Sequence, residues 1–426
     1  MKKVLIITYY WPPAGGPGVQ RWLKFVKYLQ DFDIEPIVYI PENPDYPILD
    51  ESLLKEIPKG ITILKKRIFE PYFLAKVFSK KETSTISSGI IKEAKSQNFL
   101  QKLFLYIRGN FFIPDARKFW VKPSVNFLSE YLSENKIDTI ITTGPPHSLH
   151  LIGLGLKKKL DLKWFADFRD PWTEIGYHKK LKLSASAEAK HIALEREVLT
   201  SADHIITTSF ATQREFKSKT VKPVTVITNG YDLIDNEFSE LDKKFSLAHI
   251  GSLLSGRNPK NLWKALKELT SENINFKEDL VLKLVGTVSN DVLDSIKEQN
   301  LEGYLELPGY VSHSEANKIQ QTSQVLLLLE IDSSETKGII PGKVFEYMAA
   351  KRPILALGPK DWDVKSLLEE TNSGKYFGFQ ENENLKKHIL NMYNLYKIQQ
   401  LKASSVNTVK YSRMNLTGEL AKILKD

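Results

Sequence analysis

Charged side chains around residue 343 have the types and spacing that suit them to anion binding. Lys343 follows a loop punctuated by Pro341 and Gly342, and it opens a helix whose apolar residues recur at helical spacing through Ala350. Free backbone N–H groups and the helix dipole favour an anion at such a start. Lys343 adds a positive charge, and Glu346 adds an acceptor one turn on. These groups suit a ligand with phosphates and hydroxyls; a surface helix with a solvated Lys343–Glu346 pair is the alternative.

A second candidate ligand loop lies near the amino terminus. The apolar run Lys2–Thr8 has the pattern of a buried parallel strand, and the glycine-rich stretch Pro12–Gly18 separates it from a helical pattern that begins at Val19. Gly15 and Gly16 allow a substrate to approach the main chain closely. The stretch lacks the spacing of a dinucleotide fingerprint and the Lys-Ser/Thr of a P-loop. A tight turn that only connects strand and helix explains the same residues.

These loops belong to two series of alternating strands and helices. The first series has expected strands at residues 2–8, 34–40, 61–64, 139–143, 163–168, 204–207 and 224–228. The second has expected strands at residues 245–251, 280–285, 304–307, 325–329 and 354–357. Expected helices include residues 124–133, 187–201, 382–401 and 416–424. Each series predicts a doubly wound parallel sheet, so the fold class is α/β with two Rossmann-like domains.

The length of 426 residues also favours two domains. We expect an amino-terminal domain at 1–235, a carboxy-terminal domain at 243–405 and a terminal helix within 406–426 that either stays with the second domain or crosses back to the first. The polar stretch that ends at Asp242 is the expected linker. Ligands bind beyond the carboxyl ends of parallel strands, so two such domains facing each other would enclose the candidate loops in a central cleft.

Further candidate residues fall at expected strand ends in the first series. Asp167, Arg169 and Asp170 lie at the end of one strand, and His147 follows another at an expected helix start. Carboxylates, imidazole and guanidinium can position a hydroxyl or move its proton. An internal ion pair around Arg169 and a capping or packing role for His147 are the structural alternatives.

Positive charge is concentrated in one segment. Residues 60–130 hold 13 Lys and Arg against 5 Asp and Glu, an excess of eight within a net charge of +9. A helix there carries an apolar side that includes Phe99, Leu103, Ile107 and Phe111 next to basic residues, which suits an anionic membrane surface. A core-facing helix with a solvated basic face gives the same pattern. No nucleic-acid motif accompanies the charge, so we expect no nucleic-acid partner.

The chain contains no cysteine, which excludes disulfides, thiolate metal sites and cysteine nucleophiles. The amino-terminal apolar run is too short for a signal peptide, and no apolar stretch reaches the ~20 residues of a membrane span. We therefore expect a cytoplasmic protein, with the inner face of the plasma membrane as a peripheral site. Asp31-Phe32-Asp33 and Asp361-Trp362-Asp363 match a metal-binding DxD pattern but are expected to be surface turns or helix ends, so no metal is predicted.

Several short motifs, taken in order, resemble glycosyltransferase family 4 and its two-Rossmann GT-B fold. The resemblance spans most of the chain and rests on the amino-terminal glycine loop, Asn229-Gly230-Tyr231-Asp232, His249-Ile250-Gly251, Leu284-Val285-Gly286, Pro308-Gly309-Tyr310-Val311 and the Lys343–Ala350 block. The resemblance rests on the order and spacing of these motifs taken together.

The resemblance implies that the carboxy-terminal domain binds a nucleotide diphosphate sugar. Arg257 and Lys343 then grip the diphosphate, and Glu346 matches the second glutamate of the family's Glu-x7-Glu motif, which meets the ribose hydroxyls. Tyr310 and Val311 match the edge that meets the base. The glycine loop, Gly15 and Gly16, approaches the phosphates from the other domain.

Two departures from the family pattern concern the donor. Gly338 stands where the first glutamate of the motif would be, and Ser252 replaces an arginine that often follows the Gly251 strand. The first change affects contacts to the donor sugar, and the second removes one partner of the diphosphate. Main-chain N–H groups near residues 339–342 are the expected substitutes.

The implied activity is that of a glycosyltransferase of the hexosyltransferase type, retaining and metal-independent, with no cofactor beyond its donor substrate. It would extend a glycan or a polyprenyl-linked acceptor in surface polysaccharide synthesis. His147, Asp167, Arg169 and Asp170 are the candidates for acceptor positioning and catalysis. A nucleotide-sugar epimerase or hydrolase on the same fold is the alternative.

Overall fold

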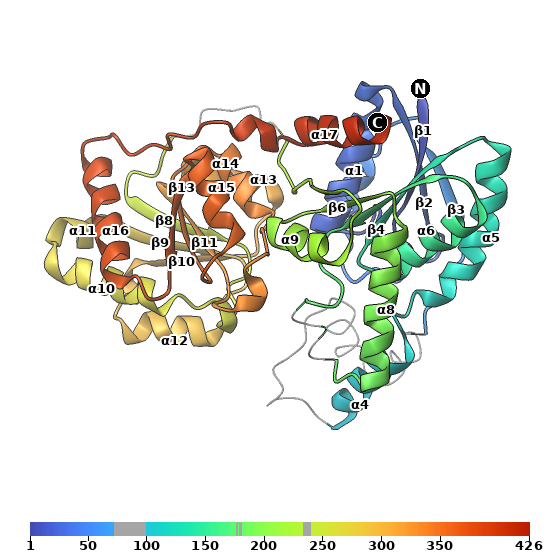
Figure 1. The fold of residues 1–426 in the computed structure, drawn as a ribbon. Helices are drawn as coiled ribbons and strands as arrows, with labels where there is room; N and C mark the ends of the chain where they lie inside the picture. The colour runs from blue at the N-terminus through green and yellow to red at the C-terminus, as the bar shows by residue number, and fades with distance from the viewer. Residues whose placement is uncertain (72–98, 176–177, 179–180, 233–239) are drawn as a thin grey trace. The chain divides into compact units, whose positions relative to one another are not determined.

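The computed structural model describes residues 1–71, 99–175, 178, 181–232 and 240–426, which form two compact units. The amino unit is Met1–Thr228 with Arg413–Asp426, and the carboxyl unit is Asn229–Ser412. Figure 1 shows a twisted sheet with helices in each unit. Most of the predicted linker, and residues 72–98 of the predicted basic segment, lie outside the described residues.

The amino unit is built on a seven-stranded parallel sheet in the order β3-β2-β1-β4-β5-β6-β7. Its strands are β1 (Lys2–Ile7), β2 (Ile34–Pro41), β3 (Thr62–Lys66), β4 (Thr139–Gly144), β5 (Lys163–Phe168), β6 (His204–Thr207) and β7 (Val224–Val226). Residues Val4–Ile7 of β1 are fully buried, as expected for a central strand covered on both faces. The chain order reverses between β1 and β4, which creates a switch point at their carboxyl ends.

Helices cover both faces of this sheet. They are α1 (Pro17–Leu29), α4 (Phe99–Phe111), α5 (Lys118–Glu134), α6 (Ser148–Lys159), α8 (Ala185–Ser201), α9 (Phe210–Lys219) and α17 (Arg413–Lys425). The last helix, α17, packs against α1, and Lys2 Nζ donates to the Leu424 carbonyl, 2.6 Å away. The predicted helix at 124–133 starts earlier, at Lys118, and accommodates Pro123. Helix α9, which lacks a clear apolar stripe, was not predicted.

The carboxyl unit has a six-stranded parallel sheet in the order β10-β9-β8-β11-β12-β13. Its strands are β8 (Phe245–Ile250), β9 (Leu280–Val285), β10 (Leu305–Gly309), β11 (Val325–Leu329), β12 (Ile354–Gly358) and β13 (Gly374–Gly378). Strand β13 was not predicted, because it is an edge strand in which only Phe377 is fully buried.

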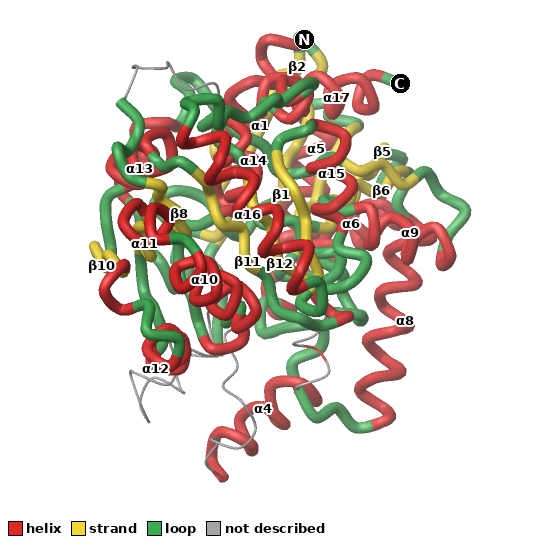
Figure 2. The backbone as a smooth tube through the Cα atoms, turned by 90° about the vertical axis from the view of Figure 1, so that its left-hand side faces the viewer, coloured by secondary structure: helices red, strands yellow, loops and turns green. Residues whose placement is uncertain are grey.

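The helices of the carboxyl unit are α10 (Lys260–Glu272), α11 (Ile274–Asp279), α12 (Asn290–Glu298), α13 (His313–Thr322), α14 (Lys343–Ala349), α15 (Asp363–Thr371) and α16 (Asn382–Lys397). Figure 2 shows α10 and α16 close together beside the strands, and the two helices are in contact. Both sheets are parallel throughout, so the predicted fold class of two doubly wound α/β domains is confirmed. Among the described residues, no helix is long and apolar enough to cross a membrane.

Candidate functional site

Three neighbouring strands of the carboxyl unit end in glycines with positive φ. Gly251 follows β8 with φ 119°, Gly286 follows β9 with φ 109°, and Gly309 ends β10 with φ 73°. Backbone hydrogen bonds link these ends: Gly251 N donates to the Val285 carbonyl at 2.8 Å, and Gly286 N donates to Gly309 at 2.7 Å. Such dihedral angles favour glycine, so the three residues form a main-chain shelf at the carboxyl edge of the sheet.

Lys343 projects from the start of α14 onto this shelf. Its ammonium donates to the Ile250 carbonyl at 2.9 Å, and a Cβ added to Gly251 would lie only 2.7 Å from Lys343 Nζ. Tyr347, one turn along α14, is buried and accepts a hydrogen bond from Ile250 N at 3.1 Å. Burial, reinforced by the nearby Arg257 charge, lowers the pKa of Lys343 to about 8. The absence of a side chain at Gly251 therefore makes room for a cation beside the strand end.

Arg257 lies on the loop after β8 and is held by a residue that the sequence analysis missed, Glu330. Arg257 Nε donates to Glu330 Oε1 at 3.0 Å, and its terminal nitrogen donates to Oε2 at 3.4 Å. The Glu330 side chain is 1% exposed, whereas that of Arg257 is 34% exposed. The available signal was a carboxylate placed directly after the apolar strand Val325–Leu329.

The other predicted donor residues also lie in the carboxyl unit. Glu346 accepts a hydrogen bond from Gln320 Nε2 at 3.2 Å. Tyr310 follows the Gly309 turn and is 95% exposed, with Val311 next to it half-buried. Ser252 is exposed directly after Gly251. Their roles in donor binding stay predictions.

The loop before α14 is anchored by Trp362. Trp362 is buried, and its Nε1 donates to the Ile339 carbonyl at 2.6 Å. The next residue, Asp363, starts α15 and donates its N–H to the Lys337 carbonyl at 2.8 Å. The DxD-like triplet 361–363 therefore positions the loop that leads to Lys343, and Asp31-Phe32-Asp33 ends a short 3-10 helix. Among the described residues, no group of three His, Cys, Asp or Glu could hold a metal ion.

Asp167 of the amino unit is enclosed by internal donors. Its carboxylate accepts hydrogen bonds from Arg21 at 2.8 Å, Trp22 Nε1 at 2.9 Å and Thr143 Oγ1 at 2.8 Å. Arg21 and Asp167 are both buried. These contacts tie α1 to the ends of β4 and β5, and the ion-pair partner of Asp167 is Arg21 instead of the expected Arg169. A catalytic role of Asp167 stays a prediction.

Arg169 lies where β5 approaches the amino-terminal helix. Its guanidinium donates to the Pro145 carbonyl and lies 5.7 Å from the centre of the Tyr10 ring. A Cβ at Gly18 would collide with this guanidinium, so the glycine makes room for it. Burial raises the pKa of Asp170, and the Arg169 charge opposes that shift. Arg169 thus joins β5 to the glycine-rich loop, in which Gly16 has φ 105°.

His147 is buried directly before α6. Its ring stacks on Trp172 with centres 4.8 Å apart and planes at 4°, and neither ring nitrogen has a hydrogen-bond partner among the described residues. Burial, reinforced by nearby His150 and Arg169, lowers its pKa well below 6.5, so the ring is neutral at pH 7. His150, His178 and His191 are also buried, a cluster that only the tertiary structure assembles.

Gly15 completes the predicted set. Its N–H donates to the Ile48 carbonyl at 3.0 Å, and an added Cβ would lie 3.0 Å from the Ile48 side chain. The structure therefore gathers the predicted donor residues of the second series at one sheet edge of the carboxyl unit. It gathers the glycine loop and Arg169 near the ends of β1, β4 and β5 in the amino unit.

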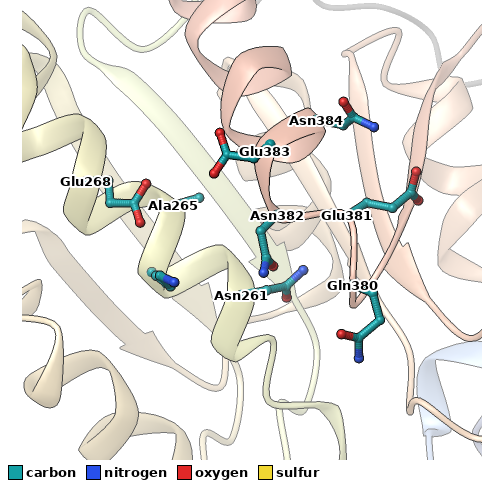
Figure 3. A pocket seen from close by; sticks show the side chains of 9 residues that line it. Asn261, Ala265, Glu268, Gln380, Glu381, Asn382, Glu383 and Asn384 are labelled. Atoms are coloured by element: carbon teal, nitrogen blue, oxygen red, sulfur yellow. The ribbon is translucent and has the colours of Figure 1, made fainter.

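A separate cavity of about 380 Å³ lies between α10 and the start of α16 (Figure 3). Its lining comprises Asn261, Lys264, Ala265, Glu268, Gln380, Glu381, Asn382, Glu383 and Asn384. None of the predicted site residues lines it.

Comparison with known proteins finds one family model that matches part of the chain. Residues 92–234 match the sequence model of Glycosyltransferase Family 4. The match leaves the carboxyl unit after residue 234 outside it. A search of curated proteins finds no match.

Solved structures share the fold over the whole chain. The lipopolysaccharide outer core galactosyltransferase WaaB aligns with a TM-score of 0.57, 13% identity and coverage of 100% of both chains. A mutant of TarM from S. aureus, in complex with fondaparinux, alpha-GlcNAc-glycerol and UDP, aligns with a TM-score of 0.59, 12% identity and coverage of 100% of both chains. A putative UDP-N-acetylglucosamine 2-epimerase from Listeria monocytogenes aligns at 0.56, with 13% identity over 100% of this chain and 96% of that chain.

The match over residues 92–234 and the shared GT-B fold confirm the predicted resemblance to this family, the predicted fold class and the predicted enzyme class, a glycosyltransferase. At sequence identities of 12–13%, these structures establish only the shared fold. The roles of individual residues stay predictions.

Proposed function

We propose that this glycosyltransferase moves a sugar from a nucleotide diphosphate sugar to a glycan or lipid-linked acceptor in surface polysaccharide synthesis. The observation that carries the proposal is the pair of cations, Arg257 and Lys343, at the glycine shelf of the carboxyl unit. Sugar transfer builds negative charge on the departing diphosphate, and cations fixed beforehand stabilise that charge most effectively. The presence of UDP in the TarM complex supports a nucleotide donor.

The proposed reaction is retaining and needs no metal. Arg257 and Lys343 each offer charge-assisted hydrogen bonds worth roughly 1.5–3 kcal/mol, which can neutralise the leaving group. In a same-face mechanism the leaving phosphate takes the proton of the acceptor hydroxyl. In the amino unit, the neutral ring of His147 is the group best suited to position that hydroxyl, because both of its nitrogens lack hydrogen-bond partners among the described residues.

Activity on defined substrates tests this proposal. The protein is incubated with nucleotide sugars and a polyprenyl-linked acceptor, and release of nucleoside diphosphate is measured. Lys343→Ala should lower kcat by about 10²–10³, the usual effect of removing one transition-state donor. Lys264→Ala, an exposed lysine on α10, is the control and should leave the rate unchanged. Wild-type turnover by Lys343→Ala would refute the role of the shelf.

Two further measurements address the finer points. Nuclear magnetic resonance of the product gives the anomeric configuration, which the proposal expects to equal that of the donor. Addition of EDTA should leave the rate unchanged. An inverted product or a rate abolished by EDTA and restored by Mg²⁺ would contradict the retaining or the metal-independent part.

We also propose that the enzyme works at the cytoplasmic face of an anionic membrane, through α4 and its neighbours. Leu103, Tyr106 and Phe111 of α4 are 44%, 43% and 64% exposed, and Phe119 on α5 is 43% exposed. Lys118 lies against the Phe119 ring at 5.3 Å, and burial together with the charge of Lys190 lowers its pKa. Exposed aromatic residues beside lysines suit an anionic lipid surface.

Vesicle binding tests the membrane proposal. The protein should sediment with vesicles that contain anionic phosphatidylglycerol and not with neutral phosphatidylcholine vesicles. Phe111→Ser should weaken this binding without changing thermal stability. Val221→Ser is the matched control, since Val221 is fully exposed elsewhere in the amino unit. Equal binding of all variants to anionic vesicles would show that Phe111 does not contribute to the membrane contact.

A nucleotide-sugar epimerase or hydrolase is the second candidate, favoured by the fold shared with the Listeria protein. Both reactions proceed without an acceptor. Product analysis in the absence of acceptor separates the candidates: isomerised or hydrolysed sugar supports this second function, and intact donor supports transfer.

A further inference from the structure

Glu330 and Arg257 form an ion pair with one buried end and one partly exposed end. Glu330 comes directly after β11, and its Oε1 also accepts the N–H of Ile331 at 2.9 Å. The carboxylate is therefore held by the backbone of its own strand end. Arg257 approaches it from the loop after β8, with two nitrogens of the guanidinium on the two carboxylate oxygens.

The geometry leaves part of the guanidinium available. Arginine carries five N–H donors in a rigid planar fork. The bonds to Glu330 use Nε and one terminal nitrogen, along a single edge of the fork. Within the described part of the chain, no other acceptor bonds the remaining guanidinium hydrogens, and the side chain keeps 34% exposure. A two-point contact along one edge fixes the orientation of the plane and presents the other edge outward.

We propose that Glu330 is a positioning residue for the donor diphosphate: it holds Arg257 by one edge so that the other edge, together with the Lys343 ammonium, binds the phosphates. This inference rests on the proposed function. Glu330 itself does not touch the substrate. It keeps a flexible cation in one orientation before the ligand arrives, which lowers the entropy lost on binding.

Glu330 also acts on Lys343 through charge. The charged and titratable groups around Lys343 are Arg257 from the loop after β8, His249 on β8, Glu330 after β11 and Glu346 on α14 itself. Burial and Arg257 lower the pKa of Lys343, whereas Glu330 and Glu346 raise it, with a result of about 8. His249 is buried and neutral, since its pKa lies at about 3.

The sign of the effect follows from these charges. The cationic form of Lys343 binds the diphosphate, so binding weakens as the pH rises through the pKa of Lys343. Loss of the Glu330 charge removes one group that favours the cation. The pKa of Lys343 then falls, and the alkaline loss of binding moves to lower pH.

The experiment measures the Kd of UDP, GDP and ADP by calorimetry between pH 7.5 and 9.5. Phosphate monoesters have completed their second ionisation, with a pKa of about 6, in this range. Glu330→Gln preserves the shape of the side chain and removes its charge. We expect about 10–100-fold weaker binding at pH 7.5, as for loss of a charge-assisted hydrogen bond, and an alkaline midpoint below that of the wild type.

Glu381→Gln is the matched control. Glu381 follows β13 of the same sheet, and its carboxylate accepts the N–H of Gly378 at 2.7 Å. This variant should keep the wild-type Kd and midpoint. Unchanged binding by folded Glu330→Gln, or weaker binding with an unmoved midpoint, overturns the inference.

Arg257→Lys is the second variant, and it keeps the charge but lacks the planar fork. Arg257→Lys should bind the diphosphates more weakly, as Glu330→Gln does, while the pH midpoint of its alkaline loss of binding stays equal to that of the wild type. Wild-type affinity of Arg257→Lys would overturn the positioning role, even if Glu330→Gln does not fold. Wild-type protein that binds none of the three diphosphates at any pH refutes the proposed function instead.

Discussion

The two units treat charge at their sheet edges in opposite ways. In the amino unit, the carboxylate of Asp167 lies among three internal donors and pairs with Arg21, which is equally buried. In the carboxyl unit, the buried Glu330 pairs with Arg257, whose guanidinium stays partly exposed. Both pairs lie at the ends of parallel strands. The difference teaches that a strand-end ion pair becomes a candidate binding group when one partner keeps donors available to a ligand.

The units also differ in their buried and half-buried histidines. In the amino unit, His147, His150, His178, His191 and His204 all have lowered pKa values, mainly through burial. In the described carboxyl unit, His249 and His388 behave in this way. A buried neutral imidazole must pick up a proton on unfolding below pH 6.5, so acid favours the unfolded state.

Acidification should therefore produce the largest difference in stability between the two units. Each such histidine contributes stability at pH 7 that is lost as the pH falls below 6.5 towards its folded pKa, about 1.4 kcal/mol per pH unit. We expect hydrogen exchange between pH 7 and 5 to show the amino unit opening first. His191→Gln should reduce this acid sensitivity, because the pKa of His191 lies at about 4 in the folded protein. Earlier opening of the carboxyl unit would contradict the comparison.

Removal of the Asp167 charge should lower the free energy of unfolding of the protein, beyond any effect on catalysis. Asp167→Asn leaves the buried Arg21 guanidinium without its counter-ion, for which about 3–5 kcal/mol is typical. Denaturant unfolding measures the loss. Asp33→Asn is the matched control, because Asp33 is exposed and its φ of 56° is tolerated by asparagine. A folded, fully stable but inactive Asp167→Asn would restore Asp167 as a catalytic residue.

Gly251→Ala should disturb the shelf of the carboxyl unit. The added Cβ would meet Lys343 Nζ at 2.7 Å, and φ of 119° strains any L-residue. Displacement of the ammonium should weaken UDP binding about 10–100-fold, equal to roughly 1.4–2.7 kcal/mol. Gly303→Ala, where nothing lies within 4 Å of the new methyl group, should bind UDP normally. Unchanged UDP binding by Gly251→Ala would contradict the proposed role of Lys343 in donor binding.

The smallest effect is expected at Tyr310. This ring is 95% exposed, so its removal should change the free energy of unfolding by less than about 0.5 kcal/mol. If the ring packs on the base, Tyr310→Ala should weaken UDP binding by about 1 kcal/mol and inorganic pyrophosphate binding not at all. Equal losses of affinity for UDP and for pyrophosphate would show that Tyr310 does not recognise the base.

Strands made mostly of apolar residues were predicted with their observed bounds, as for Lys163–Phe168, Leu280–Val285 and Val325–Leu329. Their burial on both faces leaves a strong pattern in the sequence. Helix α9 and strand β13 were missed, since a weak apolar stripe and an edge position leave little pattern to detect. Residue types at strand ends likewise pointed to Arg257 and Lys343 without revealing Glu330 as the group that holds Arg257.

Sequence alone determined the alternation of strands and helices, the two series, and the family-like order of motifs, because these properties are local and periodic. Only the tertiary structure decided which charged side chains are paired within the protein. Arg21 and Asp167 are far apart in the chain, as are Arg257 and Glu330, and parallel strands with crossover helices bring them together. Whether an ionisable group is structural or available to a ligand depends on such partners and on burial, which are properties of the packed fold.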